Sequence, residues 1–143
     1  MTVPARVSIV TLGVADVARA SAFYAALGWE RASASQEEIA WFRTADTNVG
    51  LFGYDALAKD AGLPAEPRAR FGGITLAINV ESEEAVDAAL ATAEAVGGTI
   101  IKAAARAEWG GYSGYFADPD GHPWEVAYNP HFPINSDGRV AIP

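Results

Sequence analysis

The chain has 143 residues, half of them apolar, with 18 acidic and 10 basic side chains and no cysteine. This length suits one domain with a sizeable core, and a formal net charge of −8 leaves no basic surface for nucleic-acid or membrane phosphates. The absent cysteines exclude disulfides and thiolate chemistry. Because no apolar run has membrane-spanning length and the N-terminus lacks the apolar core of a secretory signal, we expect a cytoplasmic protein.

The first half of the chain predicts a strand, a helix and three further strands. Residues 8–14 alternate as a strand does, and Asp16 then stands where a helix N-cap belongs. The apolar residues that follow at helical spacing are Val17, Ala20, Phe23, Tyr24 and Leu27. Gly28 ends this helix. The three strands are expected over residues 29–34, 39–44 and 48–54.

The second half repeats that order. A strand is expected over residues 73–80, and Ser82 can cap a helix whose buried stripe is Val86, Leu90 and Ala93. Three strands follow, over residues 99–103, 112–117 and 123–128. The segment 74–78 echoes 10–14 at an offset of 64 residues, so the two halves read as a duplication.

This repeat defines the domain organisation. One domain holds module one at about residues 6–54, a connector at 55–70, module two at about 71–129 and a tail at 130–143. A short helix is expected near residues 56–61. Pro64 and Pro67 make the rest of the connector extended.

The sequence of module two predicts a hairpin whose second strand carries one carboxylate. Residues 118–121 read Asp-Pro-Asp-Gly, a tight-turn signature between two strands rich in aromatic and β-branched residues. In the second strand, alternation puts Glu125 on the face opposite Trp124 and Val126. That carboxylate either faces solvent or lies in a pocket.

These features together resemble the vicinal-oxygen-chelate superfamily, the group of glyoxalases, bleomycin-resistance proteins and extradiol dioxygenases. The resemblance rests on the two modules, on residues 16–28 and on the turn leading to Glu125. It implies an α+β fold in which two tandem βαβββ modules form a cupped mixed half-barrel sheet with helices outside. It does not specify the chemistry, because members include lyases, isomerases, dioxygenases and drug-binding proteins.

The resemblance also implies where a metal would bind. Metalloenzymes of the superfamily take one ligand from the first and one from the last strand of each module, as His, Glu or Gln. Here Ile9 and Gly73 occupy the two first-strand positions. Leu51 is the module-one counterpart of Glu125 when Tyr54 is aligned with Tyr128, and a one-residue slip would bring Gly50 or Phe52 instead. Only Glu125 can bind a metal, so we expect no metal and no other cofactor.

Two histidines could take part in a rebuilt site. His122 is expected to be a hydrogen-bonding residue of the turn, and His131 lies in the tail, from where it would have to fold back. One carboxylate with at most one displaced imidazole makes a poor transition-metal site.

The expected binding site is therefore an aromatic-lined cleft. Its candidate ligand-binding residues are Trp41, Phe52, Tyr54, Glu108, Trp109, Tyr112, Tyr115 and Glu125, although alternation requires some aromatics to face the core. Gly110 and Gly111 suggest a loop that can open and close. Glu125 is a ligand contact, a carboxylate satisfied by a neighbouring hydroxyl, or a general base with a raised pKa; Glu108 is at the pocket mouth or is a solvated loop charge.

Three functions remain open at this point. The first is metal-independent binding of a small organic molecule. The second is a glyoxalase-type lyase, isomerase or dioxygenase that uses Glu125 with an atypical or absent metal, so enzymatic activity is undecided. The third is an accessory subunit whose cup contacts another chain. The resemblance further implies a homodimer, and the connector at residues 55–70 permits module exchange.

Overall fold

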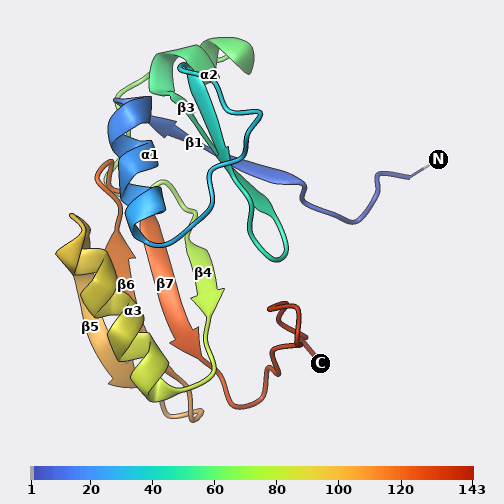
Figure 1. Ribbon diagram of the computed structural model, residues 1–143, viewed down its shortest axis with the longest axis vertical. Coiled ribbons are helices and arrows are strands. Elements are labelled where there is room, and N and C mark those ends of the chain that lie inside the picture. Colours follow the sequence, from blue (N-terminus) through green and yellow to red (C-terminus); the bar gives the residue numbers. More distant parts are fainter. Residues whose placement is uncertain (1) are drawn as a thin grey trace. The chain divides into compact units, whose positions relative to one another are not determined.

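The computed structural model describes residues 2–143, and these divide into two compact units at the boundary between Ala65 and Glu66. Each unit carries one sheet with helical cover (Figure 1). The α+β class and the tandem arrangement expected from the sequence are confirmed. No helix among residues 2–143 has the length and apolarity needed to cross a bilayer.

The first unit contains a three-stranded mixed sheet in the order β1-β3-β2. Its elements are β1 (Ile9–Val14), α1 (Val17–Ala26), β2 (Ile39–Phe42), β3 (Asn48–Gly53) and α2 (Tyr54–Asp60). β1 runs parallel to β3, and β2 runs antiparallel to it. The expected capping residue is confirmed, because the Asp16 carboxylate accepts the Arg19 backbone N–H at 3.1 Å.

One strand predicted in this unit is absent from the described residues. Residues 29–34 form only an isolated bridge, between Arg31 and Phe42, beside β2. The Ser35 hydroxyl accepts the Trp41 backbone N–H at 2.9 Å, which takes a donor away from the strand ladder. The segment is also short of β-branched and aromatic residues, so a turn competes with strand pairing.

The first core lies between α1 and one face of this sheet. Leu51 and Phe42 are fully buried there, and the Tyr24 ring on α1 lies 6.0 Å from the Phe42 ring and 5.4 Å from the Trp29 ring. The opposite face carries Thr11, Trp41, Gly50 and Phe52, which the strand registers align side by side. We call this second surface the Trp41 face.

The second unit contains a four-stranded mixed sheet in the order β4-β7-β6-β5. Its elements are β4 (Leu76–Asn79), α3 (Glu83–Ala95), β5 (Thr99–Arg106), β6 (Tyr112–Ala117) and β7 (Pro123–Tyr128). α3 lies along one face of this sheet (Figure 1). The Ser82 hydroxyl caps α3 by accepting the Ala85 backbone N–H at 3.0 Å, as expected.

The core of the second unit lies beneath α3. Phe116 and Trp124 stack with their ring centroids 6.3 Å apart, and Val126 is fully buried beside them. The opposite face carries Ala77, Tyr115 and Glu125 as direct cross-strand neighbours. We call this second surface the Glu125 face.

Two strands of this unit differ from their predicted lengths. β4 begins at Leu76 instead of residue 73, because Gly73 has a φ of +83° and therefore leaves the extended conformation. β5 continues to Arg106, three residues beyond its expected end. Its pairing with β6 is interrupted by register shifts on both sides of Lys102, which indicate β-bulges.

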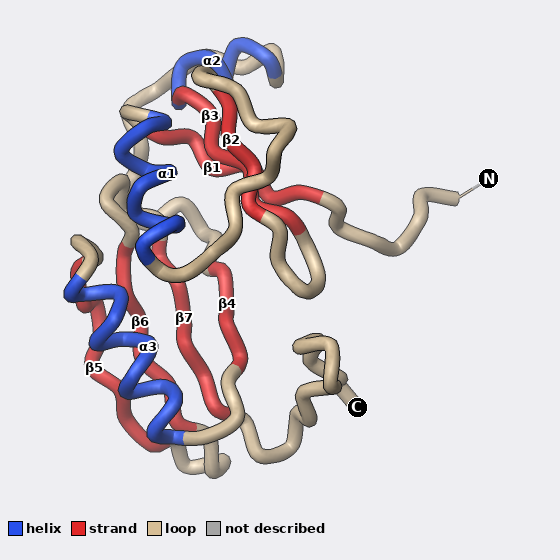
Figure 2. The backbone as a smooth tube through the Cα atoms, in the orientation of Figure 1, coloured by secondary structure: helices blue, strands red, loops and turns tan. Residues whose placement is uncertain are grey.

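The predicted turn between β6 and β7 is confirmed. The Asp118 carboxylate is buried and accepts backbone N–H groups from Asp120 at 3.0 Å and His122 at 2.9 Å. Gly121 takes the left-handed φ of +86° that the turn requires. Beyond β7 the chain continues as loop to its C-terminus (Figure 2), with a bridge between Ile134 and Val140.

Candidate functional site

Three of the predicted aromatic residues gather on the Trp41 face of the first unit. Trp41 and Phe52 come from β2 and β3, and the Tyr54 ring covers Gly13 of β1 on the same face. A Cβ atom at Gly13 would lie 2.9 Å from Tyr54 Cδ2, so the missing side chain there makes room for the tyrosine. The grouping of these aromatics within module one fits an apolar binding surface.

The Glu125 face of the second unit holds a polar row. Tyr115 and Glu125 are direct cross-strand neighbours, and interactions with Glu125 and with the Thr75 side chain act on the pKa of the Tyr115 hydroxyl. Lys102 of β5 is the cross-strand neighbour of Tyr115 on the other side. This row therefore supplies one negative charge, one positive charge and two hydroxyls, from Glu125, Lys102, Thr75 and Tyr115.

The environment of Tyr115 changes its acidity. Burial raises the pKa of the Tyr115 hydroxyl, and the charge and hydrogen bond of Glu125 raise it further, while the Thr75 hydrogen bond opposes them. The neutral hydroxyl is thus the favoured form. At neutral pH it therefore presents a donor beside the Glu125 carboxylate.

This arrangement predicts a late-titrating tyrosine. The Tyr115→Phe variant should lose one tyrosine's share of the absorbance change at the alkaline end of a spectrophotometric titration, above the ordinary tyrosine pKa of about 10. Because the pKa is raised in the folded state, its stabilising effect is complete below about pH 10 and is lost as pH rises through the folded value. The difference in free energy of unfolding between wild type and Tyr115→Phe, measured with urea, should therefore become smaller at alkaline pH. A difference that does not change with pH would contradict the raised pKa of Tyr115.

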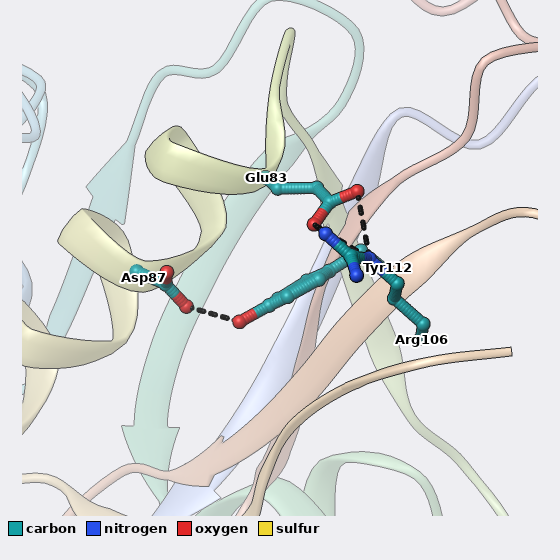
Figure 3. Close-up of polar contacts among 4 residues, drawn as sticks. All are labelled: Glu83, Asp87, Arg106 and Tyr112. Atoms are coloured by element: carbon teal, nitrogen blue, oxygen red, sulfur yellow. Dashed lines mark hydrogen bonds and ion pairs between the residues drawn. The ribbon is translucent and has the colours of Figure 1, made fainter.

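Three further candidates lie away from the Glu125 face. Tyr112 faces α3, because its hydroxyl donates to the Asp87 carboxylate at 2.6 Å (Figure 3). Glu108 and Trp109 lie in the turn between β5 and β6, where Glu108 is exposed and Trp109 is 54% exposed.

The glycine-rich turn beside Trp109 is held by hydrogen bonds. The Ala107 backbone N–H donates to the Gly111 carbonyl at 2.8 Å, and the Gly110 N–H donates to the Ala107 carbonyl at 3.0 Å. The Trp109 ring lies so close to Gly111 that a Cβ atom there would overlap it. The segment is therefore a closed turn with the indole folded back on it.

The metal-ligand positions can now be assigned by strand register. Gly13 and Ala77 correspond at the repeat offset of 64 (77 − 13), and their parallel-strand neighbours are Phe52 and Glu125. The module-one counterpart of Glu125 is thus Phe52, one residue from Leu51, which is fully buried on the α1 side of the sheet. Leu51, the counterpart expected from the sequence, is therefore one residue out of register, and the one-residue slip to Phe52 gives the correct pairing.

The donor set does not fit the metal site that the family resemblance implies. The four positions hold Ile9, Phe52, Gly73 and Glu125, and the only carboxylate among them is paired across the strands with Tyr115. Within residues 2–143, no three histidine, aspartate or glutamate side chains gather in a way that could hold a metal ion.

Neither histidine is placed to complete such a site. His122 lies in the β6–β7 turn, with its Nδ1 atom 3.1 Å from an Arg68 guanidinium nitrogen. His131 is exposed in the tail, where its backbone N–H donates to the Asn129 side chain at 2.9 Å.

Chelation should therefore leave the protein unchanged. Removal of a metal that binds only the folded state would lower the melting temperature. Because we expect no such metal, dialysis against EDTA should leave the melting temperature unchanged. Elemental analysis of the purified protein is the companion measurement. A stoichiometric metal, together with a lowered melting temperature after its removal, would overturn this assignment.

Thr75 and Lys102 were not among the residues selected from the sequence. Thr75 immediately precedes β4 and is two residues before Ala77, which pairs with Glu125. The echo of residues 10–14 in 74–78 was a signal that could have identified it. Lys102 could not have been found by alternation, because the bulges in β5 interrupt the regular period.

Comparisons with known proteins agree with this fold. The sequence model described as Glyoxalase/Bleomycin resistance protein/Dioxygenase superfamily matches residues 6–126. A search of the curated proteins gave no match.

Among solved structures, the chain is similar to a glyoxalase-related enzyme from Fulvimarina pelagi, at 32% identity over 97% of this chain and 99% of that one, with a TM-score of 0.87. A family member from Burkholderia phytofirmans PsJN matches at 24% identity over 87% and 98% of the two chains, with a TM-score of 0.78. A lactoylglutathione lyase from Agrobacterium tumefaciens matches at 23% identity over 88% and 95%, with a TM-score of 0.67. Because the last two identities are below 25%, these two structures show a similarity of fold alone.

Proposed function

The chain belongs to the Glyoxalase/Bleomycin resistance protein/Dioxygenase superfamily, and from this membership and the site geometry we propose that it binds a small organic molecule at the Glu125 face without a metal. The observation that carries the proposal is the pairing of Tyr115 with Glu125 on a half-buried sheet surface. A lone carboxylate in such a place needs a donor, and the Tyr115 side chain is its cross-strand neighbour. The remaining acceptor capacity of Glu125 is available to a ligand hydroxyl or amine.

The neighbouring groups indicate what the ligand offers. A donor on the ligand would meet Glu125, an acceptor would meet Lys102 or Thr75, and its apolar body would rest on the Tyr115 ring and Ala77. Charge-assisted hydrogen bonds are about twice as strong as neutral ones, so Glu125 should contribute most of the polar affinity. Turnover is not needed for any of these contacts.

A fragment screen tests this proposal. We expect some members of a library of aromatic alcohols, amides and amines to shift the backbone amide NMR signals of Ala77, Tyr115 and Glu125 saturably. For those hits, Glu125→Gln should weaken binding by at least about 10-fold, the range of a lost hydrogen bond to a charged group. Glu84→Gln removes the same charge from an exposed position on α3 and serves as the control. The proposal fails if no hit perturbs the Glu125 face, or if both variants bind equally well.

A homodimer is part of the proposal. Each unit exposes two apolar side chains at or just before its first strand, and they occur near equivalent positions of the repeat: Val7 and Ile9 in module one, Phe71 and Ile74 in module two. A second copy could cover such side chains. Size-exclusion chromatography with light scattering should give twice the chain mass of 15.0 kDa; a monomer at micromolar concentration would contradict the dimer and leave the binding proposal intact.

A further inference from the structure

A concave surface lies on the side of the second sheet that is opposite the Glu125 face, between α3 and β5. It is a groove of about 350 Å³, within the size range of small-molecule sites. The side chains that line it include Asp87, Leu90 and Glu94 of α3, Ile100 and Ala104 of β5, and Tyr112 of β6. We call it the α3–β5 groove.

The floor of the groove is apolar, and small residues and the bulges in β5 leave it hollow. Leu90 is buried at its centre and packs against Gly114, where a Cβ atom would lie 2.7 Å from the leucine Cδ1. β5 bulges on both sides of Lys102, and the residues of this part of β5 that line the groove are Ala103 and Ala104. The hollow therefore follows from the absence of large side chains at these positions.

Carboxylates flank that floor. Asp87, Leu90 and Glu94 lie on one face of α3 because their spacing is three and four residues. The two acidic residues are thus two turns apart, roughly 10 Å along the axis, with Leu90 between them. α3 contains four acidic residues and no basic one.

The polar network in Figure 3 sets the charge at one end of the groove. Tyr112 donates to one oxygen of Asp87 and so fixes the carboxylate beside its own ring. Arg106 is the nearby cation, and its guanidinium is held by Glu83, with Nε at 3.1 and 3.3 Å from the two carboxylate oxygens. With Arg106 neutralised in this pair, the groove keeps the two negative charges of Asp87 and Glu94.

We infer that the α3–β5 groove binds an organic ammonium ion with an apolar body. The ammonium group would lie against Asp87 or Glu94, and the apolar part would cover Leu90 and the Tyr112 ring. A positive charge near the face of an aromatic ring adds to the attraction. This site is separate from the Glu125 face, since Tyr112 and Tyr115 point to opposite sides of β6.

Benzylammonium is a suitable probe, with benzyl alcohol as its uncharged counterpart of nearly the same shape. We expect benzylammonium to bind with an affinity on the order of millimolar, as its eight heavy atoms allow. It should shift the amide NMR signals of Leu90, Ala104 and Tyr112 saturably. Benzyl alcohol should bind more weakly, and raising salt to about 0.3 M should weaken only the charged probe.

Two variants separate charge from shape. Glu94→Gln should weaken benzylammonium binding about two- to five-fold, the range of an exposed ion pair, while the control Glu84→Gln, outside the groove, should not. Ala91→Leu fills the groove from an exposed position of α3 and should abolish the shifts, with the melting temperature retained.

The outcomes distinguish this inference from the proposed function. Shifts confined to Ala77 and Glu125 would place the ammonium ion on the Glu125 face and overturn the groove site, while agreeing with the proposed function. Equal binding of benzyl alcohol, or equal weakening by Glu84→Gln and Glu94→Gln, would also overturn it.

Discussion

Replacing Leu51 by glutamate is expected to unfold the first unit. Leu51 is fully buried between α1 and the sheet, and an ionised carboxylate there would have no partner. The cost of burying it unpaired, added to the lost packing of the leucine, should exceed about 4 kcal/mol. Far-UV circular dichroism and urea unfolding measure the loss, and Leu51→Met should remain folded because it conserves volume.

The matched substitution is one residue away. Phe52 lies on the Trp41 face, is half-buried and corresponds to Glu125 in the repeat. Phe52→Glu should therefore cost only roughly 1 to 2 kcal/mol, mostly for the lost aromatic burial. If Leu51→Glu were as stable as Phe52→Glu, the register that places Phe52 opposite Gly13 would be wrong.

The second large effect is expected at Gly114 of β6. A Cβ atom there would lie 2.7 Å from Leu90 Cδ1 and 2.9 Å from both the Ala104 nitrogen and the Lys102 carbonyl oxygen. Two of these three neighbours are backbone atoms of the bulged β5 strand, so they cannot move aside without breaking the β5–β6 pairing. Overpacking of this kind costs about 1 to 3 kcal/mol, and we expect Gly114→Val to reach the upper end.

Urea unfolding of Gly114→Val and Gly72→Ala tests this directly. Gly72 belongs to the same unit, has no atom within 4 Å of its ideal Cβ position and does not need a positive φ. Its alanine variant should stay within about 0.5 kcal/mol of wild type. A Gly114→Val protein as stable as Gly72→Ala would show that β5 does not approach β6 as closely as described.

Local signals along the chain correctly predicted several parts of the fold. The caps at Asp16 and Ser82 and the turn at residues 118–121 are fixed by contacts within a few residues. Alternation in β7 put Glu125 opposite Trp124 and Val126, which are buried as expected. These features depend on short-range hydrogen bonds and on a regular period of two, so they can be read without the rest of the molecule.

Prediction failed where the regular period breaks. The bulges around Lys102 hid its position beside Tyr115. A positive φ at Gly73 shortened β4. In each case the backbone departs from ideal geometry to satisfy contacts with residues far away in the chain, and propensity does not report such contacts.

The sequence by itself determined the family, the duplication and the identity of the one carboxylate at the former ligand positions, because composition and motif spacing are local properties. The tertiary structure decided which face each side chain occupies: Tyr112 meets Asp87 on α3, whereas Tyr115 meets Glu125 on the opposite face. A step of one residue exchanges the two faces of a strand, so the assignment of Leu51 or Phe52 depended on cross-strand pairing between distant segments. That pairing is set by burial of the whole sheet against its helix, which no short stretch of sequence contains.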